Sequence, residues 1–421
     1  MDRISAPRGT QDILPPDSNL WTQLEETIRR NGERFVYGEI RTPIFEHSEL
    51  FARGVGQDTD IVSKEMYTLL DRGGRSLTLR PEGTACVARA FLQQNLANLR
   101  GLPQKLFYIG PMFRYERPQA GRYRQHHQFG FEVFGDPQPE MDAEVIAIAI
   151  SIFRALGIRQ FEVDLNSIGC RECRPVFLAA LKKELAPHLM ELCTDCQRRY
   201  QQNPIRMLDC KKETCQLMLD QAPHPVDFLC LQCQTHFIRM QKCLSALGFS
   251  FRLSPRLVRG LDYYTRTVFE IVSPELGAQN ALCGGGRYDD LIEILGGPPT
   301  PGVGFAGGME RAMLILQENQ APEPLRLDVY LVPLGEEAYS QAMLLAMRLR
   351  EAGIRTELSY DRRGLSAQLK VANRKHARFA LLLGEQELKE GSLLLRNMES
   401  GEQRTISKSE VLQSISSVLA V

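Results

Sequence analysis

The 421-residue sequence predicts a large α+β domain that is interrupted by a cysteine-rich insertion, followed by a separate α/β domain. Three observations support this prediction. Many β-prone segments and a few long helices fill the first three quarters of the chain without regular alternation. Eight cysteines are concentrated between residues 170 and 233. From residue 328 onward, strand and helix patterns alternate, which is typical of an independent α/β unit.

The elements of the first part follow from hydrophobic periodicity. Residues 17–36 predict a helix, because Trp21, Leu24 and Ile28 recur near the 3.6-residue period. A short β-prone piece follows and ends at Pro43. Apolar runs then predict strands at 77–79, 105–109, 129–134 and 161–165, and an apolar helix at 142–156.

The last part begins after a linker composition, APEPLR, at residues 321–326. We expect strands at 328–333, 355–358, 379–383 and 393–396, and helices at 336–352, 364–375 and 409–419. We therefore divide the chain into a core of residues 1–169 and 246–322, an insertion of residues 170–245, and a C-terminal domain of residues 327–421.

Composition and missing motifs exclude several classes of protein. Lys+Arg and Asp+Glu both number 51, so the chain is not polybasic, although a local basic face could still bind nucleic acid. The start, MDRISAPRGTQDILPP, has no apolar stretch, and no run reaches the roughly 18–20 residues of a membrane span, so we expect a cytoplasmic protein. No P-loop is present, and the G-x-G-x-x-G match at Gly302, Gly304 and Gly307 lacks a βαβ context. Any phosphate is therefore expected to be held by arginines.

The eight clustered cysteines form four pairs with spacings typical of zinc knuckles. The spacings are C-x2-C, C-x2-C, C-x4-C and C-x2-C, and the residues are Cys170, Cys173, Cys193, Cys196, Cys210, Cys215, Cys230 and Cys233. Such pairs suit one or two tetrahedral sites with four thiolate ligands each. A set of reduced buried thiols is the alternative. We favour structural zinc, and interpret Cys86, Cys243 and Cys283 as spare thiols.

Residues 107–135 form the densest charged constellation and read as strand, loop, strand. Arg114 and Glu116 lie at the end of the first strand, and Gln128, Gly130 and Glu132 share one face of the second. The phenylalanines between them would anchor the hairpin and leave the charged face over a packed sheet. Arginine suits phosphate there because of its flat, bidentate fork. A solvated hairpin with exposed charge is the alternative.

Three further stretches combine glycine with arginine. In residues 257–270, Arg259 precedes Gly260 and a Tyr263–Tyr264 pair, which could form a pocket for a flat polar ring or an ordinary turn. Residues 281–288, ALCGGGRY, allow close backbone approach to a ligand or a flexible turn. Residues 301–314, PGVGFAGGMERAML, lead into a helix that carries Glu310 and Arg311.

Taken in order, these motifs resemble the histidyl-tRNA synthetase family of class II aminoacyl-tRNA synthetases. The resemblance covers nearly the whole chain and rests on PRGTQDILP (7–15), TLRPEGT (78–84), FRYERPQAGRYRQHHQFGFEVFG (113–135), LVRGLDYYT (257–265), ALCGGGRYD (281–289) and GVGFAGGMER (302–311). It implies an antiparallel-sheet catalytic domain, a C-terminal anticodon-binding domain and a homodimer. It does not imply the zinc, which we expect to stabilise the insertion near the tRNA acceptor arm.

The resemblance also implies roles for the site residues in ATP-dependent charging of tRNA(His) with L-histidine. Arg114 and Arg259 would be catalytic groups at the α-phosphate and the histidine carboxylate, and Arg311 would hold the γ-phosphate. Glu116 would lie near the nucleotide, with Mg²⁺ on the β- and γ-phosphates. The expected histidine contacts are Glu82, Gly83, Thr84, Arg114, Gln128, Glu132, Arg259, Tyr263 and Tyr264.

The tRNA is expected to be read in two places. Gln119 and Arg122 would lie near the acceptor stem. In the C-terminal domain six basic residues and no acidic ones lie between positions 362 and 378, which indicates either a solvated helix face or a backbone-binding surface: Arg362, Arg363, Lys370, Arg374, Lys375 and Arg378. The main alternative function is a non-catalytic paralogue that regulates ATP phosphoribosyltransferase. That family lacks an anticodon domain and has degraded ATP arginines, which disfavours it here.

Overall fold

The computed structural model describes residues 4–119, 121–319, 327–360 and 362–419. The chain divides into two compact units, residues 1–321 and residues 322–421. The predicted linker at 321–326 lies outside the described residues. Within the described part, no helix has both the length and the apolar character needed to cross a bilayer.

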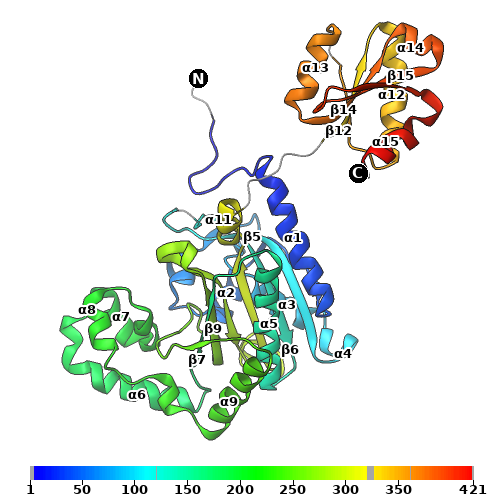
Figure 1. Ribbon diagram of the computed structural model, residues 1–421. Helices are drawn as coiled ribbons and strands as arrows, with labels where there is room; N and C mark the ends of the chain where they lie inside the picture. The colour runs from blue at the N-terminus through cyan, green and yellow to red at the C-terminus, as the bar shows by residue number, and fades with distance from the viewer. Residues whose placement is uncertain (1–3, 120, 320–326, 361, 420–421) are drawn as a thin grey trace. The chain divides into compact units, whose positions relative to one another are not determined.

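An eight-stranded, mainly antiparallel sheet forms the centre of the first unit (Figure 1). Its strand order is β1-β5-β6-β11-β10-β9-β7-β8, and only the pairs β1–β5 and β7–β8 are parallel. The strands are β1 (Gly38–Glu39), β5 (Gln104–Phe113), β6 (Gln125–Phe134), β7 (Glu162–Ser167), β8 (Arg252–Leu253), β9 (Thr265–Val272), β10 (Ala281–Arg287) and β11 (Gly302–Gly308). The sheet therefore agrees with the predicted α+β class.

Helices cover one face of this sheet. They are α1 (Asp17–Arg34), α5 (Pro139–Ala155), α9 (Leu231–Ala246) and α11 (Met309–Asn319). Phe129 and Phe131 of β6, Phe305 of β11 and Phe269 of β9 point to this side and are buried with Ile146 and its neighbours of α5. Because side chains alternate along a strand, the residues between these phenylalanines face the other side of the sheet.

A smaller layer is formed by residues 45–100. It contains the three-stranded sheet β2-β4-β3 and four helices. The elements are β2 (Phe45–His47), α2 (Ser48–Gly54), η1 (Ile61–Glu65), β3 (Tyr67–Leu70), β4 (Ser76–Leu79), α3 (Thr84–Gln93) and α4 (Leu96–Arg100), and α10 (Leu291–Ile294) packs against α2 and α3. Only β4 of this small sheet was predicted, because β2 and β3 are short and half exposed.

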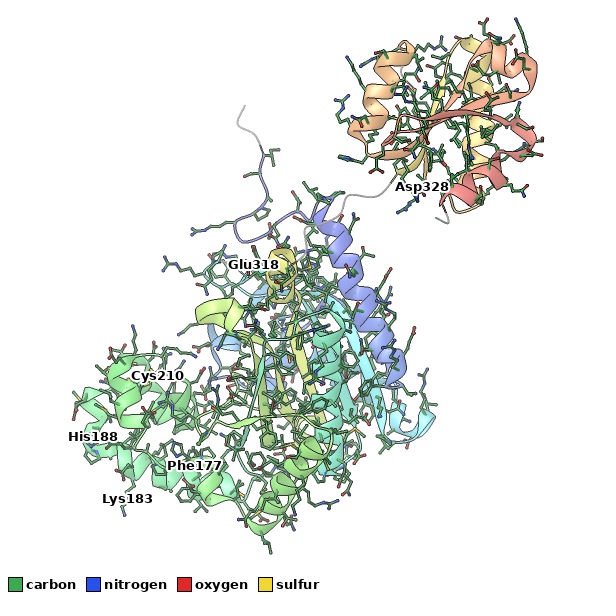
Figure 2. The ribbon with its side chains drawn as sticks, in the orientation of Figure 1. Phe177, Lys183, His188, Cys210, Glu318 and Asp328 are labelled. Carbon is green, nitrogen blue, oxygen red and sulfur yellow. The ribbon has the colours of Figure 1, made fainter. Side chains whose placement is uncertain are left out.

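The cysteine-rich insertion is helical and leaves the sheet after β7 (Figure 2). It contains α6 (Cys173–Leu185), η2 (Ala186–Glu191), α7 (Thr194–Gln202), η3 (Pro204–Asp209), α8 (Glu213–Leu219) and η4 (Pro225–Phe228), and it returns through α9. Its buried residues, among them Phe177 and Cys210, belong to the same apolar cluster as Tyr263, Tyr264 and Tyr288. The insertion therefore shares its core with the second face of the main sheet.

The second unit is a mixed sheet with helices on its faces. The strand order is β13-β12-β14-β15-β16, and the first three strands are parallel. The elements are β12 (Leu327–Pro333), α12 (Glu336–Glu351), β13 (Thr356–Leu358), α13 (Leu365–Arg374), β14 (Ala377–Leu383), α14 (Glu385–Glu390), β15 (Ser392–Asn397), β16 (Gln403–Ser407), η6 (Lys408–Glu410) and α15 (Val411–Leu419). The sequence predicted these elements except α14, β16 and η6.

Candidate active site and cysteine clusters

Small residues line the centre of the sheet face that lies opposite the α5 layer. The strand registers place Glu270 of β9, Gly284 of β10, Ala306 of β11, Gly130 of β6 and Tyr108 of β5 in one row. The next rows along β11 and β10 bring in further glycines, including Gly304, Gly308 and Gly286. The glycine-rich stretches are therefore the central strands β10 and β11. Their small residues leave space above this face of the sheet, and we call this part of the face the glycine floor.

Arg259 lies across this floor. A Cβ atom at position 284 would overlap its guanidinium group, so only glycine leaves room for that side chain. Arg259 is paired with Glu270, and its Nε is buried without a hydrogen-bond partner. Burial lowers the pKa of Arg259, but the nearby Glu270 carboxylate outweighs this effect and raises the pKa above its usual value. The guanidinium is therefore a fixed positive charge.

Arg311 and Arg114 are held near the start of β10 and the end of β5. The Nη1 of Arg311, in the first turn of α11, donates to the carbonyl of Ala281 at 2.6 Å. Burial lowers the pKa of Arg311, and the positive charges of Arg122 and Arg259 lower it further. Arg114 follows β5 and donates from Nε to the carbonyl of Pro81 at 2.8 Å. The pKa of His126 is lowered to about 3 by desolvation, with added repulsion from Arg114, Arg311 and Arg122.

Carboxylates partly balance these cations. Glu116 is paired with Arg122 and lies 3.8 Å from the Nη1 of Arg114. Arg122 and Gln119 face each other across the loop that joins β5 to β6, with backbone hydrogen bonds of 2.9 and 3.1 Å. The two residues predicted to contact tRNA are therefore neighbours, and Glu116 connects them to the arginines of the floor.

A buried polar network lies beside the arginines. Glu82 accepts hydrogen bonds from the backbone of Thr84 at 2.8 Å and of Ala85 at 2.7 Å, where α3 begins. The hydroxyls of Thr84, at 2.7 Å, and of Tyr288 donate to the Glu132 carboxylate. Burial raises the pKa of Glu82 and raises that of Glu132 to about 8. Gly304 makes room for the Glu132 carboxylate, because a Cβ there would overlap it.

Three tyrosines close this network. The ring centroids of Tyr263 and Tyr264 are 4.7 Å apart, and that of Tyr288 lies 5.6 and 6.4 Å from them. The hydroxyl of Tyr263 reaches Glu82 at 3.5 Å. Burial raises the pKa of Tyr264 to about 12, so its hydroxyl remains protonated near neutral pH.

Two other predicted histidine contacts complete the set. Gln128 lies on the floor, and its Oε1 is buried without a hydrogen-bond partner. Gly83 faces the ring of Tyr108, which a Cβ at position 83 would overlap. The structure thus brings the sequence-predicted histidine contacts, which come from three segments of the chain, together beside one face of the sheet.

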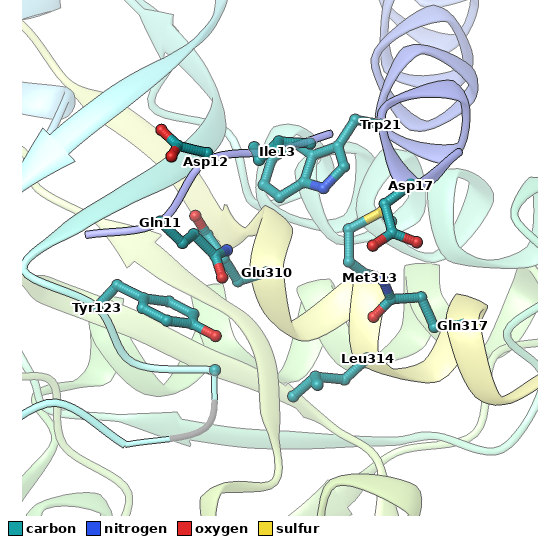
Figure 3. A pocket seen from close by; sticks show the side chains of 11 residues that line it. Gln11, Asp12, Ile13, Asp17, Trp21, Tyr123, Glu310, Met313, Leu314 and Gln317 are labelled. Atoms are coloured by element: carbon teal, nitrogen blue, oxygen red, sulfur yellow. The ribbon is translucent and has the colours of Figure 1, made fainter. Parts of the chain in front are cut away.

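A separate surface pocket lies on the α11 side of the hairpin loop (Figure 3). Its wall includes Trp21 of α1, Tyr123 of the hairpin loop and Met313 of α11. Glu310 forms part of this wall, and it accepts hydrogen bonds from the backbone N–H of His127 at 2.8 and 3.0 Å. Glu310 therefore joins α11 to β6 and does more than balance the helix dipole.

Comparison with known proteins now gives the family. Residues 9–312 match the family model described as Histidyl-tRNA synthetase, and residues 328–417 match Anticodon binding domain. The chain belongs to the histidyl-tRNA synthetase family. A protein named Histidine--tRNA ligase from Moorella thermoacetica is 52% identical over 404 residues, covering 96% of this chain and 95% of that relative. Its counterpart from Natranaerobius thermophilus is 51% identical over 401 residues, covering 94% of this chain and 95% of the relative.

A solved structure agrees with this assignment. The apo S. aureus histidyl-tRNA synthetase crystal structure is similar with a TM-score of 0.83 and 38% sequence identity. The match covers 98% of this chain and 100% of that one. The predicted family, the class II antiparallel sheet and the C-terminal anticodon-binding domain are confirmed.

Eight of the eleven cysteines of this family member form two groups of four. The proximal cluster is Cys170, Cys173, Cys230 and Cys233, and the distal cluster is Cys193, Cys196, Cys210 and Cys215. In each cluster all four sulfur atoms lie within 4.8 Å of one another, and none of the eight forms a disulfide. The first pair in the sequence thus joins the last pair, and the two middle pairs join each other.

The sulfur separations fit a single bound ion. A tetrahedral site with metal–sulfur bonds of about 2.3 Å has sulfur atoms about 3.8 Å apart. The separations are 3.6 Å for Cys170–Cys173, 4.0 Å for Cys170–Cys230 and 3.8 Å for Cys193–Cys210. Backbone N–H groups of Cys230 and Cys193 also point at sulfur atoms, at 3.1 and 3.2 Å. The residues present therefore fit one tetrahedral ion in each cluster.

Sequence reasoning did not single out several partners in this synthetase-family site. Glu270, which pairs with Arg259, lies in an ordinary alternating strand and carries no motif signal. Tyr288 ends the ALCGGGRY stretch, which could have marked it as a floor residue. His127 follows His126 in the hairpin, and nothing in the sequence indicates its partner Glu310.

Proposed function

We propose that this chain is a histidine–tRNA ligase. It joins L-histidine to ATP as histidyl-adenylate with release of pyrophosphate, and then transfers histidine to the 3′ end of tRNA(His). The observation that carries the proposal is the glycine-rich sheet face with Arg259 lying over Gly284 and with Arg311 and Arg114 held at Ala281 and Pro81, in a chain whose relatives are named Histidine--tRNA ligase.

The first step requires two anions to meet. A carboxylate must attack the α-phosphorus of ATP, so positive charge must be fixed in place before the substrates arrive. We assign Arg259 and Arg114 to the α-phosphate and the histidine carboxylate, and Arg311 to the γ-phosphate. Arg259 is suited to this role because Glu270 and the sheet hold its position, which leaves little reorganisation for the transition state.

Histidine selection is assigned to the polar network beside the floor. Glu82, Thr84 and Gln128 are placed for the α-ammonium group, and Gln128 has a buried acceptor without a partner. We assign Glu132, Tyr263 and Tyr264 to contacts with the imidazole ring. A ligand that lacks the two ring nitrogens would leave these buried polar groups unpaired, which gives strong rejection.

ATP would enter with Mg²⁺. Within the described residues, only the two cysteine clusters bring three or more ligand side chains close together, so the phosphates themselves would carry most of the Mg²⁺ coordination. The ion would neutralise phosphate charge, and Glu116 is the carboxylate that we place near it.

We propose that both units of the chain contact the tRNA. Gln119 and Arg122 are assigned to the acceptor stem. In the C-terminal unit Arg362 is paired with Glu336 and Lys375 with Glu357, so part of the basic segment is neutralised within the protein. The remaining charge would bind the backbone of the anticodon arm.

We also propose a homodimer in the cytoplasm. Phe45, Leu69 and Leu70 of the small sheet expose 56%, 47% and 72% of their surface, which suits a face that a second copy covers. Eight cysteines without disulfides suit a reducing compartment. Sedimentation of the purified protein tests the dimer.

We assign structural zinc to both cysteine clusters. Each supplies four sulfur atoms at tetrahedral spacing, and a metal there would stabilise the helical insertion. The protein purified without an affinity tag should contain two zinc ions per chain. A content near one would restrict the assignment to a single cluster, and a content below about one would end it.

The test of the main proposal is histidine-dependent exchange of pyrophosphate into ATP. Arg259→Ala should abolish exchange while the protein keeps its fold and oligomeric state. Arg256→Ala is a matched control, because Arg256 lies three residues away and pairs only with Asp220 among the described residues. Near-normal exchange in Arg259→Ala would remove Arg259 from its role, and no exchange in the wild type would favour the regulatory paralogue.

A further inference from the structure

The proximal cysteine cluster stands where the insertion joins the catalytic sheet. Cys170 and Cys173 follow β7, and Cys230 and Cys233 lie at the start of α9. A metal held by these four residues would therefore connect the segment after β7, where the insertion begins, to the start of α9, through which the chain returns. The distal cluster lies wholly within the insertion.

One set of contacts joins the proximal cluster to the tyrosine segment of the pocket. The backbone N–H of Ile168 donates to the carbonyl of Arg266 at 2.8 Å, and the N–H of Arg266 donates to the carbonyl of Gly169 at 2.8 Å. Arg174, the residue after Cys173, donates to the carbonyl of Tyr264. Arg266 has a φ of 48°, a strained left-handed conformation for a non-glycine residue. The cluster loop thus fixes the backbone that carries Tyr264.

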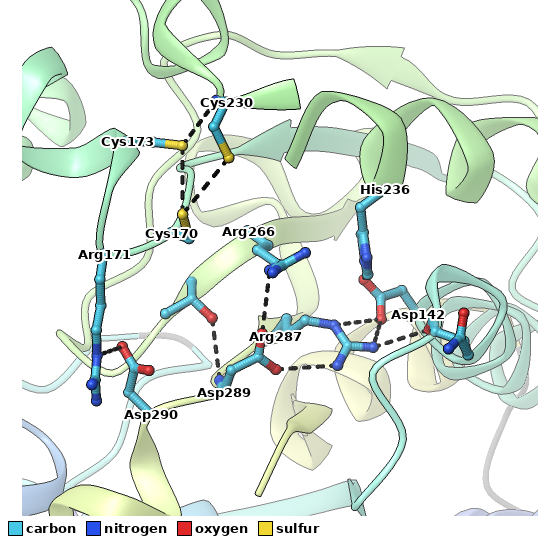
Figure 4. Close-up of polar contacts among 12 residues, drawn as sticks. Asp142, Cys170, Arg171, Cys173, Cys230, His236, Arg266, Arg287, Asp289 and Asp290 are labelled. Carbon is cyan, nitrogen blue, oxygen red and sulfur yellow. Dashed lines mark hydrogen bonds and ion pairs between the residues drawn. The ribbon is translucent and has the colours of Figure 1, made fainter. Parts of the chain in front are cut away.

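A second set runs through α9 (Figure 4). His236 lies one turn after Cys233, and its Nε2 is 2.7 Å from Asp142 Oδ2. Asp142 accepts from the Nε of Arg287 at 2.9 Å, and both side chains are at most 1% exposed. Arg287 immediately precedes Tyr288, which donates to Glu132. Through these contacts α9, the helix that starts at the proximal cluster, is connected to Tyr288 and Glu132 of the same pocket.

The two sets of contacts meet at Asp289. Its carboxylate lies 3.1 Å from Arg287 Nη1 and 3.4 Å from Arg266 Nε (Figure 4). The segments that carry Tyr264 and Tyr288 are thus linked to each other as well as to the cluster. The distal cluster has a different relation to the pocket, because its segment reaches the catalytic part through side chains, with Arg199–Asp60 at 3.2 Å and Asn203–Asp262 at 2.7 Å.

We propose that a zinc ion in the proximal cluster is a positioning element of the histidine pocket, while zinc in the distal cluster acts mainly on the insertion and affects the pocket less, through the contact of Asn203 with Asp262. The proposal rests on the proposed ligase function, since it concerns the affinity of that site for histidine. Without the proximal metal, both tyrosine segments lose their common anchor. The arginines of the floor are held by Glu270, Ala281 and Pro81, so ATP binding should change little.

The experiment measures zinc content and exchange kinetics on the full-length protein. C170S/C230S should lose one of two zinc ions and raise the KM for histidine about tenfold, with the KM for ATP changed less than about threefold. C193S/C210S is the matched control, and should lose the other zinc while the KM for histidine changes less than about threefold. Arg174→Gln keeps every thiol, so it should retain both zinc ions and still raise the KM for histidine about threefold or more.

Several results would overturn the proposal. One is a folded C170S/C230S protein that has lost one zinc but keeps its KM for histidine, and another is an equal rise in both cysteine variants. If C170S/C230S fails to fold, an unchanged KM for histidine in Arg174→Gln refutes the proposal. If the wild type shows no exchange, the ligase function fails instead, and calorimetric binding of histidine to the same variants must then show the same order.

Discussion

Gly284→Ala offers a sharp test of the glycine floor. The new Cβ would lie about 1 Å inside the ordinary contact range of the Arg259 guanidinium, so that group must withdraw by about this distance. The guanidinium is the far end of a flexible side chain, so the fold should tolerate the change. A displaced charge-stabilising group costs about 10²–10³ in rate, or about 3–4 kcal/mol, and kcat/KM for adenylate formation should fall by that factor.

The assay is pyrophosphate exchange at saturating ATP and varied histidine, with circular dichroism to confirm folding. Gly38→Ala is the matched control, because position 38 lies in the same sheet and the nearest atoms are 4.0 Å from its added Cβ. Its activity should stay within about twofold of the wild type. Retention of a third or more of wild-type kcat/KM in Gly284→Ala would refute the claim that Arg259 needs a residue without a Cβ at position 284.

Two further predictions concern buried carboxylates. Because burial raises the pKa of Glu132 to about 8, the folded protein keeps a proton that the unfolded chain releases near its ordinary pKa of 4.5. The free energy of unfolding should therefore fall as pH rises from about 5 to 8, by up to about 1.4 kcal/mol per pH unit. Glu132→Gln should flatten this fall in urea unfolding, and parallel wild-type and variant curves would contradict it. Asp142→Asn should cost about 3–5 kcal/mol, because it leaves Arg287 buried beside an uncharged group. Exposed Glu140→Gln should cost under about 0.5 kcal/mol, and equal losses would contradict the assignment.

Much of the fold could be predicted because its signals are local. The apolar repeat of α1, the alternating phenylalanines of β6 and the strand–helix alternation of the last unit each specify an element through nearby residues. Among the elements that were missed, β2, β3 and β16 are short strands, and their partners in the sheets define them more than their own sequences do.

The glycine-rich strands show where local signals fail. ALCGGGRY and GVGFAGG have weak strand propensity, yet they form β10 and β11 in the middle of the sheet. Their neighbours on both sides supply the hydrogen bonds, and the space above them is needed by Arg259 and Glu132. Likewise the cysteine spacings predicted metal ligands but not which pairs meet, because that pairing depends on how α9 returns to the end of β7.

The floor also explains why the arginines carry carboxylate partners. Cations that lie together in a half-buried site repel one another, and this repulsion adds to burial in lowering the pKa of Arg311. Glu270 and Glu116 reduce that repulsion while the site is empty, and they hold Arg259 and Arg122 in position. When triphosphate arrives, its negative charge exceeds what two carboxylates supply, so it competes well for the same guanidinium groups. Removing Glu270 should therefore make the Arg259 guanidinium more mobile without raising the rate of adenylate formation. A cation that is out of position stabilises the transition state less than one that is held in place.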